Sequence, residues 1–145
     1  MSASPELQRD MLRQMQTIRR FEERASDDYK GGDIYGVVHC YIGEEASAVG
    51  ICAALRPDDQ IISNHRGHGH CIAKGADLNR MMAELYGRVD GYCKGKGGSM
   101  HIADFSIGML GANGIVGGGL SIVTGAGLAA QMEGKGGVAV CFFGD

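Results

Sequence analysis

The sequence lacks any long apolar run. No stretch of its 145 residues approaches the roughly 18 to 20 apolar residues that a membrane-crossing helix requires, which argues against a membrane protein. The first six residues, MSASPE, carry no basic patch followed by an apolar segment, so they do not resemble a secretory signal. Both absences predict a cytoplasmic protein with no membrane partner.

The sequence also has no excess of positive charge. The formal net charge is -3 and the isoelectric point is about 5.9, so the chain has no basic footprint for nucleic acid. The five cysteines are odd in number and form no CxxC pair. This pattern is typical of reduced thiols in a cytosolic protein rather than of a disulfide framework.

Glycine, by contrast, is abundant, with 25 residues of which seventeen lie in residues 87–145. They follow no regular period, which excludes a collagen-like chain, and the apolar residues between them argue against a flexible linker. We expect these glycines to allow the backbone to approach another group closely.

Local patterns predict helices and strands in alternation. The first helix begins at Pro5 after the capping residue Ser4 and ends at Gly31. Asp77 is the expected cap of another helix. The other expected helices cover residues 44–55, 78–86 and 120–132, the expected strands cover 60–63 and 138–143 with 34–40 as a further candidate, and residues 91–119 are expected to be irregular.

The apolar segment 138–143, VAVCFF, suits a strand buried on both faces of a parallel sheet. Such a strand needs neighbours on both edges and helices above and below it, but the sequence offers few other strands. We therefore expect an α/β fold with a mainly parallel sheet, truncated after a central strand. The chain is then the N-terminal part of a longer protein, or it completes its core with a partner.

Three histidines, His65, His68 and His70, follow the expected strand 60–63. Imidazole is a common metal ligand, but the spacing HxxHxH is not a structural zinc signature. Two other interpretations are open: a hydrogen-bonded loop with one or two buried histidines, or a cationic phosphate site with Arg66 as a forked donor.

Residues 125–130, GAGLAA, permit two interpretations. They fit the GxGxxA pattern, a strand-like segment precedes them, and Asp145 stands twenty residues after Gly125, which is the layout of a nicotinamide dinucleotide site. Alternatively, residues 120–132 form one helix with Ser121, Gly125 and Ala129 on a single stripe of small residues.

Asp145 follows the expected strand 138–143 at its carboxyl end, where open α/β sheets place ligand-binding groups. A carboxylate at this position suits Mg²⁺ bound jointly with a diphosphate, because that ion takes one or two carboxylates plus phosphate oxygens. The alternative is a helix N-cap.

Five motifs occur in the same order as in one known family. They are YIGEEA at 41–46, HRGHG at 65–69, KGKGGSMH at 94–101, GANGIVG at 111–117 and FGD at 143–145. Through them the chain resembles the alpha subunit of the thiamine-diphosphate-dependent dehydrogenase component of acetoin and 2-oxo acid (pyruvate) dehydrogenase complexes. The resemblance implies one thiamine-diphosphate-binding domain, with a helical arm at residues 1–35 and the start of the α/β core at residues 36–145.

The resemblance also implies roles for individual residues. His65 and Arg66 would hold the diphosphate of the cofactor. Gly114 and Val116 would meet its aminopyrimidine ring. Asp145 would be the first Mg²⁺ ligand, in a metal motif that continues beyond this position in the family.

One further residue and one further segment match features of the active site in this family. His39 matches a catalytic histidine that binds the substrate or orients the acyl group. Residues 94–101 match an ordered loop near the cofactor and the lipoyl entrance. Glu44 stands where the pyruvate branch most often has Gln, so a role for its side chain is open.

The implied function is cleavage of acetoin, or decarboxylation of pyruvate, with transfer of the acyl group to a lipoyl carrier. Segments 69–75 and 109–114 look more like the acetoin branch. The implied partners are a beta subunit in an α2β2 assembly, which supplies the activating glutamate, and a lipoyl-bearing acyltransferase. The alternatives are a nicotinamide-binding domain and an inactive truncated paralogue that acts as a subunit-interaction module.

Overall fold

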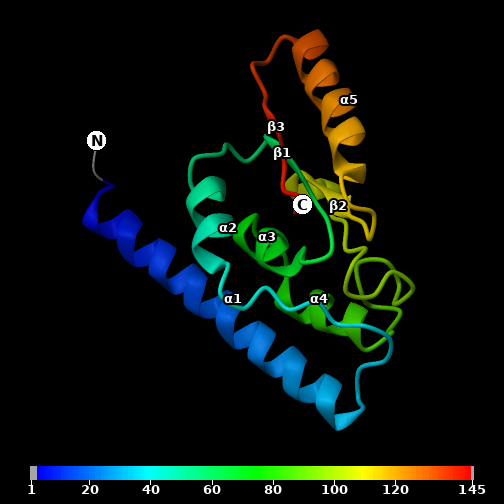
Figure 1. Cartoon of the computed structure of the whole chain (residues 1–145). Helices are drawn as coiled ribbons and strands as arrows, with labels where there is room; N and C mark the ends of the chain where they lie inside the picture. The colour runs from blue at the N-terminus through cyan, green and yellow to red at the C-terminus, as the bar shows by residue number, and fades with distance from the viewer. Residues whose placement is uncertain (1–2, 145) are drawn as a thin grey trace.

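The sheet is built around one short central strand. In the computed structural model, which describes residues 3–144, β1 (Gln60–Ser63) pairs in parallel with β2 (Met109–Ala112) and with β3 (Ala139–Cys141), in the order β2-β1-β3 (Figure 1). Ile61 lies opposite both Met109 and Val140 and is fully buried. The predicted parallel α/β architecture is confirmed.

Five α-helices of the described residues surround this sheet. They are α1 (Pro5–Gly31), α2 (Glu45–Cys52), α3 (His68–Ala73), α4 (Leu78–Leu85) and α5 (Gly118–Glu133), and a 3-10 turn, η1 (Phe105–Ile107), precedes β2. Helix α1 contacts α2, α3 and α4, whereas α5 contacts β1 and β3, so α1 and α5 lie on opposite sides of the molecule (Figure 1). Within residues 3–144, no helix is sufficiently long and apolar to span a bilayer.

Helices α1 and α4 begin at the capping residues that the sequence indicates. Ser4 Oγ accepts a hydrogen bond from the N–H of Leu7 at 3.2 Å, and Gly32 ends α1 in the left-handed conformation with φ 86°. Asp77 caps α4 by accepting from the N–H of Arg80 at 2.8 Å. Because caps satisfy backbone groups that the helix leaves unpaired, these boundaries can be read from the sequence.

Several segments differ from expectation. Residues 34–40 form no strand, α2 ends at Cys52 instead of residue 55, and β3 is shorter than predicted. Strand β2 forms inside the region 91–119 that was expected to be irregular, and α3 occupies part of the expected histidine loop. The sheet of the described residues therefore consists of β2, β1 and β3, and residues 34–40 do not belong to it.

Helix α5 decides between the two interpretations of residues 125–130. The helix is continuous from Gly118 to Glu133, so the preceding segment 120–123 is helical rather than extended and Gly125 lies in the helix interior. A dinucleotide fingerprint needs a strand, a tight glycine turn and then a helix. That layout is absent from the described residues 120–133, and the nicotinamide-binding alternative is wrong.

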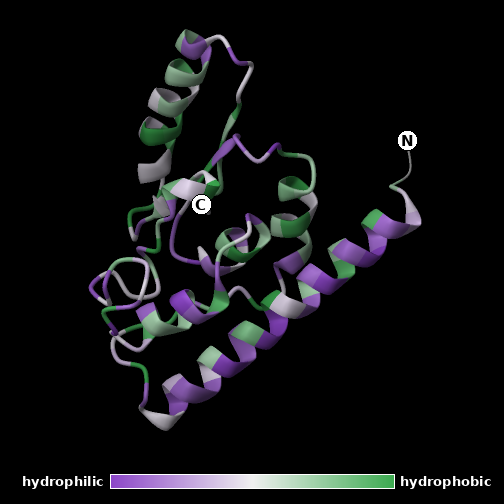
Figure 2. Ribbon diagram, turned by 180° about the vertical axis from the view of Figure 1, so that it is seen from behind, coloured by the Kyte–Doolittle hydropathy of each residue, from purple (hydrophilic) through white to green (hydrophobic). Residues whose placement is uncertain are grey.

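Helix α5 is rich in apolar residues, which colour parts of its ribbon green in Figure 2, and several of their side chains are exposed. Leu120, Leu128 and Met132 are all exposed, and within the described chain only Gly119 of α5 is buried. Gly119 allows the helix to approach the sheet, because a Cβ atom there would lie 2.8 Å from Cys141 Sγ. Helix α5 therefore approaches the sheet most closely at Gly119 and leaves many of its apolar side chains exposed.

A buried carboxylate organises the glycine-rich loop after α4. Glu84 is 1% exposed, and its Oε2 accepts hydrogen bonds from the N–H groups of Cys93 (2.7 Å) and Gly95 (2.9 Å). Its Oε1 accepts from Gly97 (2.8 Å) and Gly98 (3.0 Å). Burial by itself raises the pKa of the Glu84 carboxyl, but these four donors outweigh burial and the net pKa is lowered.

We expect Glu84→Gln to loosen this loop, because the amide replaces an acceptor oxygen by an NH₂ group that faces N–H donors. Hydrogen bonds to a charged group contribute about 1.5 to 3 kcal/mol each, so the free energy of unfolding should fall by about 2 kcal/mol. Amide hydrogen exchange at residues 93–98 should accelerate, measured by NMR or mass spectrometry. Glu133→Gln is the control, since Glu133 is exposed and pairs with Lys135 alone among the described residues. Unchanged exchange in Glu84→Gln would contradict this role.

Candidate functional site

A cavity of about 470 Å³ lies beyond the carboxyl ends of β1 and β3. This is the edge of a parallel α/β sheet at which ligands bind. The segment after β1 lines it with Asn64, His65 and Arg66, and the segment after β3 lines it with Phe142, Phe143 and Gly144. Its other lining residues are Tyr41, Glu44, Ser47, His70, Val116 and Cys141.

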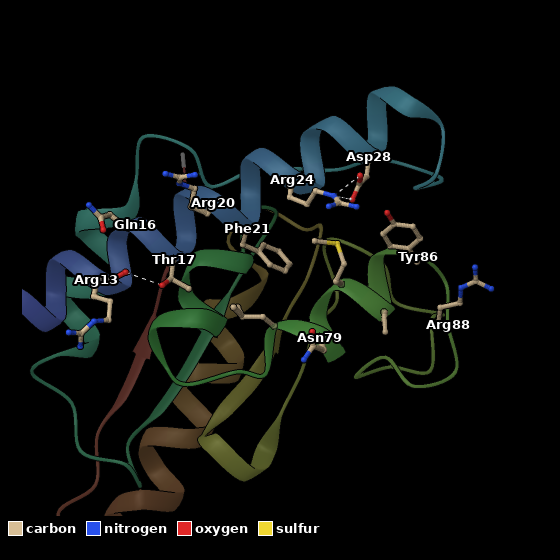
Figure 3. A pocket seen from close by; sticks show the side chains of 13 residues that line it. Arg13, Gln16, Thr17, Arg20, Phe21, Arg24, Asp28, Asn79, Tyr86 and Arg88 are labelled. Atoms are coloured by element: carbon tan, nitrogen blue, oxygen red, sulfur yellow. Dashed lines mark hydrogen bonds and ion pairs between the residues drawn. The ribbon is translucent and has the colours of Figure 1, made fainter.

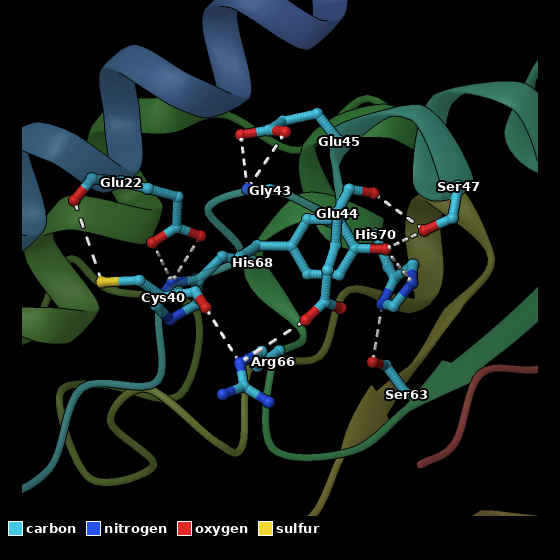
Figure 4. Close-up of polar contacts among 11 residues, drawn as sticks. Glu22, Cys40, Gly43, Glu44, Glu45, Ser47, Ser63, Arg66, His68 and His70 are labelled. Atoms are coloured by element: carbon cyan, nitrogen blue, oxygen red, sulfur yellow. Dashed lines mark hydrogen bonds and ion pairs between the residues drawn. The ribbon is translucent and has the colours of Figure 1, made fainter.

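Arg66 places a guanidinium group at this cavity. Its Nε donates to the carbonyl of Cys40 at 3.1 Å and lies 3.7 Å from Glu44 Oε1 (Figure 4). The Arg66 side chain is 54% exposed. Both of its contacts within residues 3–144 use Nε, so the two terminal nitrogens remain available as a fork for an anion.

His39 and His65 form a pair at the same site. Their ring centroids are 5.5 Å apart and their planes are perpendicular. Burial is the main cause that lowers the pKa of His39, and the nearby His65, Arg66 and His68 lower it further. His39 is therefore a neutral imidazole at pH 7, with one ring nitrogen able to donate a hydrogen bond and the other able to accept one.

The other two histidines of the HxxHxH motif are buried and hydrogen-bonded. His68 contacts Glu22 and Ser99 through its two ring nitrogens, at 3.0 Å each. His70 contacts Ser63 Oγ at 2.8 Å and the hydroxyl of Tyr41 at 2.9 Å. Since all four ring nitrogens have partners, the motif is not a metal site, and among the described residues no group of three potential ligands gathers.

His70 also lines the cavity. Its ring stacks on Phe142 with centroids 3.7 Å apart, and burial lowers its pKa to about 3. The sequence analysis considers His70 only within the HxxHxH motif and does not identify Tyr41 or Phe142 as site residues. The aromatic pair after β3 is a signal in the sequence, but it was assigned to the strand.

Of the remaining predicted site residues, Val116 lines the cavity, whereas Gly114 does not. Val116 lines the cavity and is 62% exposed. Gly114 is exposed in the turn before α5, beside Met100, and is not among the cavity-lining residues. Asp145 lies outside the described residues, and its neighbour Gly144 lines the cavity. His65, Arg66 and Val116 thus meet in one cavity, with His39 beside them.

A second, larger cavity of about 810 Å³ lies between α1 and α4 (Figure 3). Its floor includes Phe21 and Met82, and its lining includes Arg20, Arg24 and Arg88. None of the residues predicted for chemistry lines it. We place the functional site in the smaller cavity, because it gathers both the strand ends and the predicted residues.

Comparison with known proteins gives relatives along nearly the whole chain. The acetoin:2,6-dichlorophenolindophenol oxidoreductase subunits alpha of Bacillus subtilis and Cupriavidus necator are 57% and 58% identical over 135 residues, which is 93% of this chain and 40% of each relative. The pyruvate dehydrogenase E1 component subunit alpha of Rhizobium meliloti is 46% identical over 133 residues, 92% of this chain and 38% of the relative. The chain therefore spans about 40% of the length of these relatives.

The sequence model of the dehydrogenase E1 component family matches residues 13–145. This match covers the sheet, the cavity and every helix except the first turns of α1. The resemblance seen in the five motifs is confirmed, and its relatives are alpha subunits of acetoin and pyruvate dehydrogenase enzymes. The chain belongs to the dehydrogenase E1 component family.

Proposed function

We propose that this chain forms the alpha-subunit half of a thiamine diphosphate site in a dehydrogenase that cleaves acetoin. One observation carries the proposal: the cavity at the ends of β1 and β3 gathers His65, Arg66 and Val116. These are residues that the family resemblance assigns to the cofactor. Membership of the family and identities of 57% and 58% to acetoin-oxidising relatives support it.

The chemical character of the lining fits such a cofactor. One part carries Arg66, His65 and Asn64, which donate hydrogen bonds to phosphate oxygens. Another part carries Val116 and Phe143, whose apolar surfaces suit a heterocyclic ring. A cavity of about 470 Å³ lies within the range of ordinary cofactor sites.

Each residue then has a distinct task. Arg66 and His65 bind the diphosphate, Val116 and the nearby Gly114 contact the aminopyrimidine ring, and Asp145 binds Mg²⁺ jointly with the diphosphate. The bound cofactor supplies the means to attack a carbonyl carbon and to take up the electrons released when a carbon–carbon bond breaks.

His39 acts on the substrate side of the site. Because its pKa is lowered by burial first and then by His65, Arg66 and His68, its ring is uncharged at pH 7. A neutral imidazole donates a hydrogen bond to the oxygen of the reacting carbonyl without adding a further positive charge beside Arg66. His39 thereby orients the substrate and the acyl group.

The complete enzyme requires further protein. A beta subunit in an α2β2 assembly would supply the activating carboxylate, and a lipoyl-bearing acyltransferase would accept the acyl group. The exposed apolar side chains of α5 support the packing of further polypeptide on this side of the sheet.

Removal of the Arg66 guanidinium tests the cofactor site. We expect Arg66→Ala, in the complete alpha subunit mixed with its beta subunit, to weaken binding of thiamine diphosphate with Mg²⁺ by roughly 10- to 100-fold, the equivalent of one or two charge-assisted hydrogen bonds. Calorimetric titration measures it. Arg88→Ala is the control, because Arg88 lines the other cavity. Equal affinities for wild type and Arg66→Ala would contradict the proposal.

A comparison of two substrates tests the assigned reaction. We expect the assembled enzyme to reduce 2,6-dichlorophenolindophenol with acetoin at a higher kcat/KM than with pyruvate. Omission of thiamine diphosphate should abolish both reactions. Preference for pyruvate would reject acetoin as the substrate while leaving the cofactor site in place.

A further inference from the structure

A buried chain of hydrogen bonds runs from α1 to the backbone of His39. Glu22 and His68 are both fully buried, and each carboxylate oxygen of Glu22 lies 3.0 Å from His68 Nδ1 (Figure 4). His68 Nε2 lies 3.0 Å from Ser99 Oγ, and Ser99 Oγ accepts the N–H of His39 at 3.1 Å. Four segments far apart in the sequence thus meet in one line of contacts.

The two ends of this series of hydrogen bonds determine which group donates and which accepts at each step. The N–H of His39 can only donate and the ionised Glu22 carboxylate can only accept. The Ser99 hydroxyl is then satisfied when it accepts from His39 and donates to His68 Nε2, while His68 Nδ1–H donates to Glu22. In this arrangement every group has a partner, and the described residues contain no buried side-chain polar atom without one.

The segment that carries His39 depends on such side-chain contacts. Residues 34–40 belong to no helix or strand, so no ladder of backbone hydrogen bonds defines their path. Two hydrogen bonds hold the backbone here: the one from His39 N–H to Ser99, and the one from Arg66 Nε to the carbonyl of Cys40. Loss of the Ser99 contact removes the bond that is nearer to the His39 ring.

We propose that Glu22, His68 and Ser99 are positioning residues that set the location of the His39 imidazole beside His65. They act through one another, with Glu22 orienting His68, His68 orienting the Ser99 hydroxyl, and Ser99 holding the His39 backbone. The inference rests on the proposed function only in taking His39 as an active-site residue. The geometric claim, that this chain places the His39 ring, is tested without any activity.

The pKa of His39 reports on the position of its ring. Burial is the largest cause that lowers it, and His65, Arg66 and His68 add to the effect. If the segment moves outward, the ring is hydrated and lies farther from these groups, so its pKa rises toward the ordinary value of about 6.5. A purely structural role, with the ring left in place, does not move this pKa.

The rate at which diethyl pyrocarbonate modifies His39 measures this pKa, because only the neutral imidazole reacts. Tandem mass spectrometry of the peptide localises the modification to His39 across a pH series. The protein is the complete alpha subunit assembled with its beta subunit. We expect Ser99→Ala to raise the midpoint by about 0.5 unit or more, and Ser99→Thr, which retains the hydroxyl, to restore it. Ser106→Ala is the control, since Ser106 bonds only to Asp104 among the described residues.

Glu22→Gln covers the case in which Ser99→Ala does not fold. It preserves the size of the side chain and one acceptor oxygen but removes the charge that orients His68, so a smaller rise in the His39 midpoint is expected. Glu23→Gln is its matched control on the exposed face of α1. An unchanged His39 midpoint in the folded variants Glu22→Gln or Ser99→Ala overturns the positioning chain.

Activity separates this inference from the proposed function. If both hold, Ser99→Ala lowers kcat for acetoin more than it raises KM, and the pH profile of kcat shifts in the same direction as the His39 midpoint. If Ser99→Ala shifts the pH midpoint of His39 modification but the wild-type enzyme turns over neither acetoin nor pyruvate, the positioning role is supported and the proposed function is rejected.

Discussion

The parallel pairing of β1 with both of its neighbours is the constraint on which the rest of the structure depends. Because β1, β2 and β3 run in the same direction, their carboxyl ends meet at one edge, and the chain segments that leave β1 and β3 lie close together there. The cavity with Arg66 and Phe143 is the space between those segments. Fully buried Ile61, in the middle strand, ties both pairings to the core.

Two buried carboxylates order the parts of the chain that have no regular structure. Glu84 collects four backbone N–H groups of the glycine-rich loop, and Glu22 ends the hydrogen-bonded chain to His39. Ser99 belongs to the loop that Glu84 organises and also contacts His39. A buried charge is stable only when it is well paired, so these two residues specify a single path for the loops.

Local signals explain what the sequence could and could not predict. The caps Ser4 and Asp77 mark helix boundaries through their own hydrogen bonds, and the grouping of His65 and Arg66 was predicted by motif and by strand position. Strand β2 was missed because Gly111, with φ 139°, interrupts its pattern. Helix α3 was missed because its six residues are too few to show a helical repeat of apolar positions. The contacts of His68 were missed because its partners lie 46 and 31 residues away in sequence.

Helix α5 is long but contains features that make it only weakly stable on its own. Interior glycines such as Gly125 and Gly127 each cost about 1 kcal/mol relative to alanine, and within the described chain only Gly119 of this helix is buried. An isolated helix of this composition is marginal in water. A polypeptide that packed on its exposed apolar side chains, as the proposed assembly requires, would also stabilise the helix itself, so that subunit association and the order of α5 would be coupled.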